Sequence, residues 1–98
     1  MMQLEVLTPE RLLYRGLIDL VNLPGKDGRF GILEGHAPLI SVLQAGEIEV
    51  LQSTAGNKSF DNLSGDFVKD RAKDPRFTFD VKGGVVEVVN NKVIVLAD

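Results

Sequence analysis

The 98-residue sequence predicts an all-β fold: a single domain, residues 1–98, folded as a two-sheet antiparallel β-sandwich with one long charged hairpin loop. Apolar and polar residues alternate with a period of two in several short segments, which is typical of strands that bury one face. Turn-forming residues separate these segments at roughly the eight-to-twelve-residue spacing of sandwiches and barrels. No window shows a sustained apolar stripe at i, i+3 and i+4, so we expect no helix longer than about three turns.

Three strands are expected in the first half of the chain. Leu4 and Val6 alternate with polar neighbours, residues 47–50 alternate in the same way, and residues 17–23 are apolar on both sides. Because a sandwich strand needs only one apolar face, the surplus apolar residues of 17–23 favour contact with a partner.

Glycines and prolines flank a short apolar strand within residues 24–39. They predict two tight loops, suited to contact with another molecule rather than to a catalytic cleft. Four glycines of this segment are expected to adopt a positive φ, namely Gly25, Gly28, Gly31 and Gly35.

The C-terminal part of the chain predicts three more strands. Residues 76–82 alternate apolar with polar side chains, and two glycines then end this strand. Residues 85–89 and 92–96 are expected to pair as a β-hairpin, because Asn90 and Asn91 between them tolerate the positive φ of a tight turn. Both strands of this hairpin are apolar on two faces, which again favours a covering partner.

Residues 53–75 break the alternation and are rich in charged side chains. They predict a long charged hairpin loop or insertion, with one helical turn near residues 67–73.

Composition excludes several classes of protein. Eleven basic residues against fourteen acidic ones give a formal net charge of -3 without a basic stripe, which argues against a nucleic-acid partner. The chain has no cysteine, and its start lacks the features of a signal peptide, so we expect a cytosolic location. Its longest uncharged stretch, residues 37–46, is about half of the roughly twenty residues that a membrane-spanning helix needs, so no direct membrane insertion is expected.

A catalytic role is not expected. His36 is the only histidine, so neither a histidine-based metal site nor a hydrolase machinery of acid, base and nucleophile can be assembled around it. We therefore expect no enzyme activity, no metal and no cofactor, and assign His36 a structural or interface role. A stand-alone β-sandwich that binds a ligand or another protein remains an alternative on these grounds.

An ordered set of short motifs resembles the N-terminal β-sandwich domain of the epsilon subunit of F-type ATP synthases. Its centre is Gly-His-Ala-Pro-Leu at residues 35–39. The other matching segments, in chain order, are residues 4–11, 14–16, 23–25, 27–28, 30–33, 83–88 and 91–98.

This resemblance implies a non-catalytic rotor subunit of the central stalk. Such a subunit binds the gamma subunit and the c-ring of a proton-translocating ATP synthase and couples ion flow to ATP synthesis, as a peripheral protein at the cytoplasmic face of the inner (plasma) membrane. Carried over by residue, the resemblance implies that Thr8 and Ser41 face gamma. It implies that the residues facing the c-ring are Lys26, Asp27, Gly28, Arg29, Phe30, Gly31, Glu34, Gly35 and His36.

The sequence departs from the family pattern in three places. Arg29 stands where relatives often present an acidic residue to the ring. Residues 53–75 are longer than the corresponding hairpin of many relatives. The family commonly continues into a helical hairpin that inhibits ATP hydrolysis and in some members binds ATP. Because Asp98 is the last residue here, neither property is expected of this chain.

Overall fold

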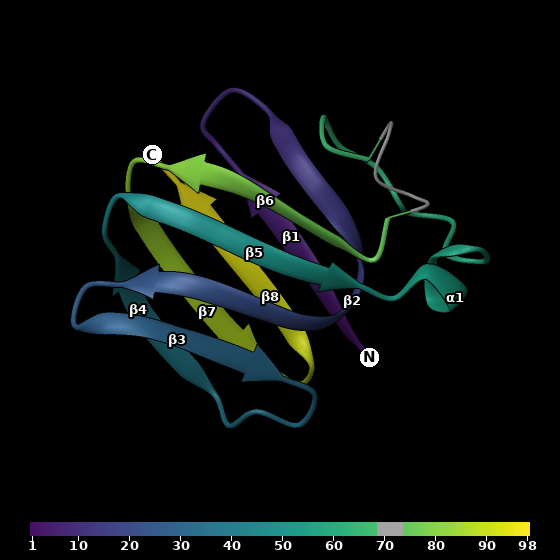
Figure 1. Ribbon diagram of the computed structural model, residues 1–98, viewed down its shortest axis with the longest axis horizontal. Coiled ribbons are helices and arrows are strands. Elements are labelled where there is room, and N and C mark those ends of the chain that lie inside the picture. The colour runs from purple at the N-terminus through teal and green to yellow at the C-terminus, as the bar shows by residue number, and fades with distance from the viewer. Residues whose placement is uncertain (69–73) are drawn as a thin grey trace.

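The computed structural model describes residues 1–68 and 74–98, and strands dominate this part of the chain (Figure 1). Its elements are β1 (Met2–Leu7), β2 (Leu12–Gly25), β3 (Gly28–Leu33), β4 (Leu39–Leu43), β5 (Gly46–Gln52), α1 (Thr54–Asn57), β6 (Arg76–Val81), β7 (Gly84–Val89) and β8 (Lys92–Ala97). The all-β prediction is confirmed, since the only helix within the described residues is four residues long.

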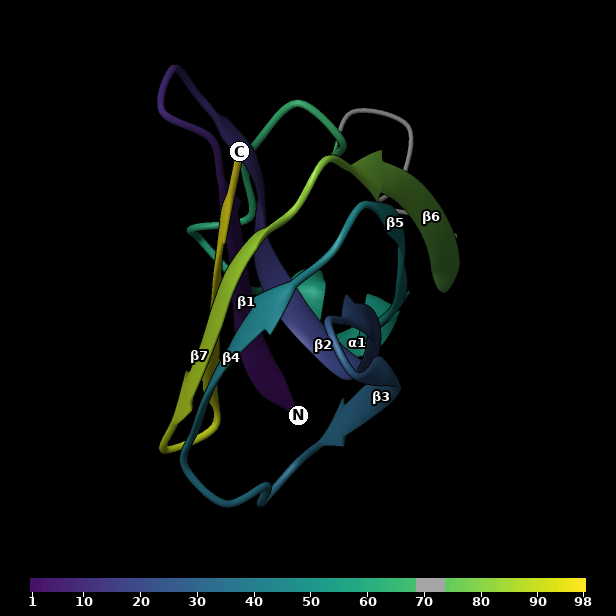
Figure 2. The same ribbon diagram turned by 90° about the vertical axis from the view of Figure 1, so that its left-hand side faces the viewer.

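The strands form two layers that face each other across the core (Figure 2). One layer contains β1, β8, β7 and β4, and the other contains β3, β2, β5 and β6. The long strand β2 connects them, because its first half pairs with β1 and its second half pairs with β3 and β5. A single pairing of Gly25 with Leu43 joins the layers again at one end of the sandwich.

The pairing is antiparallel in every ladder of the described residues except one, so the sheet is mixed. β1 and β8 run parallel, in a register from Gln3 opposite Lys92 to Leu7 opposite Leu96. A parallel pair needs a long connection instead of a hairpin, and here the whole intervening chain supplies it. The wholly antiparallel sandwich expected from the sequence is corrected by this one parallel ladder between β1 and β8.

The core lies between the layers and is built from the inward side of each strand. The largest side chains in it with less than 2% of their surface exposed are Tyr14, Met2, Leu4, Ile18, Leu23, Ile32, Ile48, Gln52, Val6, Val21, Val50 and Val86. An aromatic cluster closes one end, where the ring centroids of Tyr14 and Phe77 lie 5.2 Å apart and those of Phe67 and Phe79 lie 4.8 Å apart. The buried alternation of residues 76–82 is confirmed by this packing.

The predicted C-terminal hairpin is confirmed. Asn90 and Asn91 join β7 to β8 with φ of 51° and 60°, as a two-residue turn between strands of right-handed twist requires. The helical turn expected near residues 67–73 lies largely outside the described residues. A helical turn that the sequence did not indicate, α1, follows β5, and the Ser53 hydroxyl accepts a hydrogen bond from Gly56 N as its N-cap.

The glycine prediction is half right. Gly28 and Gly35 have positive φ, of 134° and 81°, but Gly25 and Gly31 do not. Both of the latter lie in strands where a neighbour approaches closely. A Cβ on Gly25 would stand 2.7 Å from the Phe30 ring, and one on Gly31 would stand 2.6 Å from Asn22 Oδ1.

Candidate interaction surfaces

The outward side of β4, β7 and β8 is apolar, and we call it the β4–β7–β8 face. Large apolar side chains rarely remain this open without a partner. Ile40 is 71% exposed, Leu96 57% and Val42 54%. The face consists of Ile40, Val42, Val85, Val89, Ile94 and Leu96.

Strand register makes this face continuous. Val42 lies opposite Val85, which lies opposite Leu96 on the next strand, so one apolar row crosses three strands. In the neighbouring row, Glu87 lies between Ile40 and Ile94. The confirmed surplus of apolar residues in β7 and β8 is therefore gathered on one surface.

A charged group borders the face at β1. The Glu5 carboxylate accepts a hydrogen bond from Arg15 Nε at 2.9 Å, and Lys92 Nζ lies 3.3 Å from its other oxygen. Burial raises the pKa of Glu5, but the hydrogen bonds and positive charges of Arg15 and Lys92 outweigh that effect and hold the pKa below its ordinary value. Glu5 therefore stays ionised at neutral pH and fixes Lys92 at the rim.

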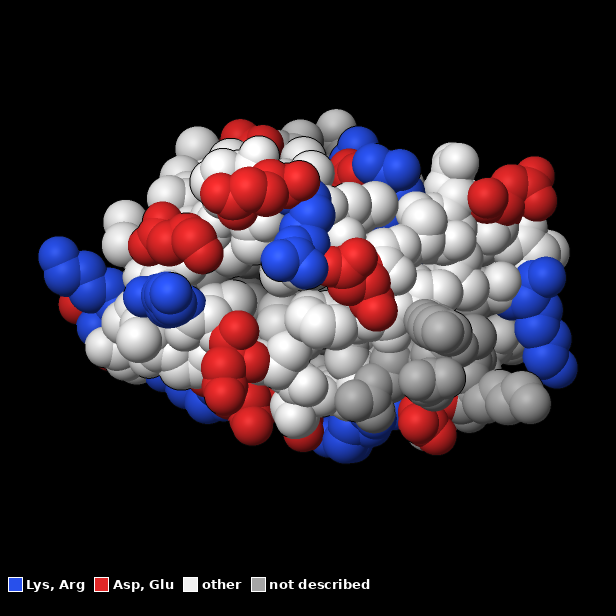
Figure 3. Space-filling view, turned by 90° about the horizontal axis from the view of Figure 1, so that it is seen from above, with Lys and Arg blue, Asp and Glu red and all other residues white. Residues whose placement is uncertain are grey.

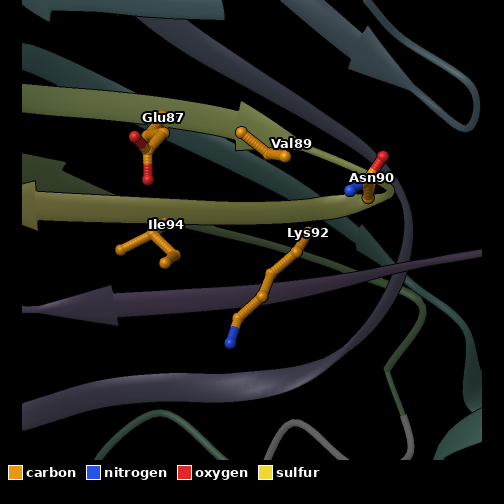
Figure 4. A pocket seen from close by; sticks show the side chains of 5 residues that line it. All are labelled: Glu87, Val89, Asn90, Lys92 and Ile94. Atoms are coloured by element: carbon orange, nitrogen blue, oxygen red, sulfur yellow. The ribbon is translucent and has the colours of Figure 1, made fainter. Parts of the chain in front are cut away.

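A shallow hollow lies on the same surface beside the β7–β8 turn (Figure 4). It measures about 320 Å³ and is lined by Glu87, Val89, Asn90, Lys92 and Ile94. Opposite charges thus flank an apolar floor, an arrangement that suits an apolar side chain with polar neighbours better than a small charged ligand.

The outward side of the other layer is polar where β2, β5 and β6 meet. Glu49 accepts hydrogen bonds from Asn22 Nδ2 at 2.9 Å and from Arg76 Nη1 at 3.0 Å. These hydrogen bonds, that of Asn22 first, lower the pKa of Glu49. Figure 3 views the molecule from above, at right angles to Figure 1, and shows acidic and basic side chains interspersed there. The surface around Glu49 thus differs in chemistry from the apolar β4–β7–β8 face.

The residues predicted to face the c-ring lie in two places. Lys26 to Gly31 form the β2–β3 turn and the first part of β3. This turn lies against the end of β4, where Lys26 N donates to Val42 O at 3.0 Å. The turn residues 26–29 are exposed. The Arg29 guanidinium donates a hydrogen bond to the Glu47 carbonyl.

Glu34, Gly35 and His36 lie at the opposite end of β3. Gly35 N donates to Asn91 Oδ1 at 2.7 Å, and Glu34 pairs with the N-terminal amine. His36 is exposed, with Nδ1 2.7 Å from the carbonyl of Ala37. β3 separates the two loops by about 17–20 Å at the usual rise per residue, so the structure does not gather the predicted residues into one cluster.

The two residues predicted to face gamma are also separated. Thr8 lies in the β1–β2 turn, where its Oγ1 accepts a hydrogen bond from Arg11 N at 3.2 Å. Ser41 lies on β4, but its side chain shares the inward side with Leu39 and Leu43. Its neighbours Ile40 and Val42 point outward instead. Sequence reasoning missed these two, although residues 39–43, apolar except for Ser41, were a signal for a strand with two apolar faces.

Residues 1–68 and 74–98 contain no group of three or more His, Cys, Asp or Glu side chains able to hold a metal ion. In the same part of the chain, no helix has the length and apolar character needed to cross a membrane.

Comparison with known families gives a match over most of the chain. Residues 1–69 match the β-sandwich domain of the ATP synthase delta/epsilon chain. The ATP synthase epsilon chain of Roseiflexus sp. (strain RS-1) is 38% identical over 95 residues, which is 97% of this chain and 54% of that protein. The epsilon chain of Chlorobaculum tepidum is 35% identical over 95 residues, covering 97% of this chain and 86% of the relative.

Solved structures show the same fold. A chain in the Euglena gracilis mitochondrial ATP synthase, OSCP/F1/c-ring, aligns with a TM-score of 0.69 and 17% identity over 96% of this chain and 48% of that chain. A chain in the central stalk/c-ring structure of the Tetrahymena thermophila mitochondrial ATP synthase aligns with a TM-score of 0.65 and 17% identity, over 98% of this chain and 62% of that chain. The chain spans about half the length of several of the relatives it matches, including that of Roseiflexus.

Proposed function

Since the chain belongs to the family of ATP synthase epsilon chains, whose members are non-catalytic subunits of the complex, we propose that it works as a rotor subunit of the central stalk. In this role it binds gamma and the c-ring of a proton-translocating F-type ATP synthase and passes torque between them. It is then a peripheral component at the cytoplasmic face of the inner (plasma) membrane, and it binds no nucleotide itself.

The β4–β7–β8 face is the proposed contact with gamma. The observation that carries this proposal is the row of Val42, Val85 and Leu96, three exposed apolar side chains that cross three neighbouring strands. An interface that transmits torque needs an apolar centre with a polar rim. Glu5 with its two cations supplies part of such a rim, beside Leu96 and Ile94 in the register of β1.

The β2–β3 turn is the proposed contact with the c-ring. Its exposed residues 26–29 are mostly polar, which suits the polar surface of a ring of loops. Arg29 is held by the Glu47 carbonyl, so its positive charge has a defined position in the contact. Thr8, Glu34 and His36 lie outside both surfaces as defined by the register.

A binding measurement with purified gamma tests the first contact. Leu96→Ser should weaken binding about tenfold, because covering the exposed 57% of this side chain contributes about 1–1.5 kcal/mol. Leu33→Ser is the matched control, since Leu33 is 60% exposed but lies on β3 in the other layer. Isothermal titration calorimetry gives both affinities.

Equal losses for the two variants would contradict the assignment of the face. Failure of the unmodified chain to bind gamma at all would favour the alternative, a stand-alone binding module.

A further inference from the structure

Residues 57–67, which we call the strap, follow the edge of the first half of β2. The strap has no strand assignment beyond a single bridge between Ser64 and Arg15. Nevertheless its backbone hydrogen-bonds as a strand would. Arg15 N donates to Ser64 O at 2.7 Å, Ser64 N donates to Arg15 O at 3.0 Å, and Phe67 N donates to Leu13 O at 2.9 Å.

Asn57 extends this row through its side chain. Its Oδ1 accepts from Leu17 N at 2.8 Å and its Nδ2 donates to Leu17 O at 2.9 Å, so one amide group imitates a peptide unit. Asn57 is 6% exposed. From Ile18 onward the same row continues with β5, beginning with the pairing of Ile18 and Gln52. The strap therefore hydrogen-bonds to backbone N–H and C=O groups of β2 that have no partner in β5.

The strap is attached by few apolar contacts. Leu63 and Phe67 are partly buried against the core, and Arg11 pairs with Asp66 at 3.1 Å on the surface. Strap residues 58, 59, 61 and 62 are exposed. A segment with this little burial opens at lower free energy than the strands beneath it.

We propose that the strap is a detachable cap, and that the β2 edge it covers pairs with the same edge of a second copy of this chain when the strap is displaced. An uncapped edge with free N–H and C=O groups is a template for strand addition. Antiparallel pairing of residues 12–18 with themselves is two-fold symmetric about Arg15 and so closes as a dimer. Glu5 already compensates the positive charge of each Arg15 at that centre.

The symmetric pairing also matches the side chains. Leu13 of one copy would lie opposite Leu17 of the other, and both are only partly buried in the single chain. This inference does not depend on the proposed rotor function, because it concerns a surface on which neither proposed contact lies.

Gly65 is the position for a direct test. Its φ is +116°, and an added Cβ would stand 2.6 Å from the backbone oxygen of Leu13, so Gly65→Ala forces the strap away from the edge. Gly28→Ala is the matched control, because Gly28 has φ +134° but nothing within 4 Å of the added atom. Sedimentation velocity over a wide concentration range reports the mass of each variant.

We expect the Gly65→Ala variant to form a dimer whose fraction rises with concentration, while the parent chain and Gly28→Ala stay monomeric. Hydrogen exchange should show the Arg15 and Leu17 amides open in the dilute variant and protected in the dimer. A folded Gly65→Ala variant that opens these amides yet stays monomeric at every concentration overturns the proposal.

Ser64→Pro provides a second test if Gly65→Ala does not fold. It removes the Ser64 N–H that bonds Arg15 O, together with the Ser64 hydroxyl that donates to Asn62 O within the strap, in a segment outside the strands. The same concentration-dependent dimer is expected. In the unmodified chain, the amides of Arg15, Ser64 and Phe67 should exchange together and faster than those of Val86 and Val95. Monomeric Ser64→Pro, or equal exchange of the two groups of amides, overturns the proposal.

Discussion

Replacing Glu5 by glutamine removes the charge that joins β1 to both of its neighbouring strands, β2 and β8. Glu5 on β1 bonds Arg15 on β2 and Lys92 on β8, and it is 9% exposed while its partners' side chains are 34% and 48% exposed. Hydrogen bonds to charged groups contribute about 1.5–3 kcal/mol each to the free energy of unfolding. Because both cations can rehydrate, we expect Glu5→Gln to cost only about 1–2 kcal/mol in total.

Thermal unfolding at pH 7 measures this loss. A domain of this size loses about 4–8 °C in Tm per kcal/mol, so a decrease of about 5–12 °C is expected. The pKa of Glu5 is lower in the folded chain than in the unfolded one, so its stabilisation is present above the ordinary glutamate pKa and is lost as pH falls through the folded pKa. The difference between the two proteins should therefore shrink below about pH 4.

Glu87→Gln is the control, because Glu87 is exposed on the same side of the sandwich and should change stability by no more than about 0.5 kcal/mol. A Glu5→Gln variant as stable as the parent, or a difference that does not vary with pH, would refute the reasoning about this ion group.

Three further predictions follow from the site and the core. Arg29→Glu should alter c-ring binding or proton coupling in the assembled enzyme while changing the stability of the isolated chain by no more than about 0.5 kcal/mol; an effect on stability alone would count against the ring contact. Burial raises the pKa of Tyr14, the single tyrosine, to about 12, so its ultraviolet absorbance should show phenolate only well above pH 10. The free energy of unfolding should decline as pH rises from about 10 toward 12, because the unfolded chain loses the tyrosine proton first. A midpoint near pH 10 in the folded chain would be inconsistent with the buried phenol. The 98-residue polypeptide, added to the catalytic core with gamma, should leave ATP hydrolysis uninhibited, because its described residues contain no helix longer than four residues to act as an inhibitory arm. Strong dose-dependent inhibition would show that the sandwich alone can stall rotation.

Local pattern was sufficient for the strands in which polar and apolar residues alternate. β5 and β6 were predictable because their apolar and polar residues alternate, and the β7–β8 hairpin was predictable because Asn90 and Asn91 mark its turn. β4 was not predicted. Its sequence, Leu-Ile-Ser-Val-Leu, lacks alternation because the outward residues are apolar too. The outward apolar residues that support a docking role for this face therefore also removed the alternation that would have predicted β4.

Long-range packing set the limits of the prediction for the site. Apolar surplus in residues 85–89 and 92–96 correctly indicated an uncovered face. Nothing local indicates that β1 would join β8 in parallel, or that β4 would place Ile40 and Val42 on that face while turning Ser41 inward. The loops at the two ends of β3 are close in sequence, but the length of the strand between them keeps them apart.

In the proposed rotor role, gamma covers the β4–β7–β8 face. Hydroxyl-radical footprinting of the chain with and without gamma measures this directly, because reactivity follows the exposure of individual side chains. We predict that Ile40 and Leu96, open in the single chain at 71% and 57%, lose reactivity in the complex, while Leu33 at 60% on the opposite layer keeps it. Protection of Leu33 with undiminished reactivity at Ile40 and Leu96 would contradict the account.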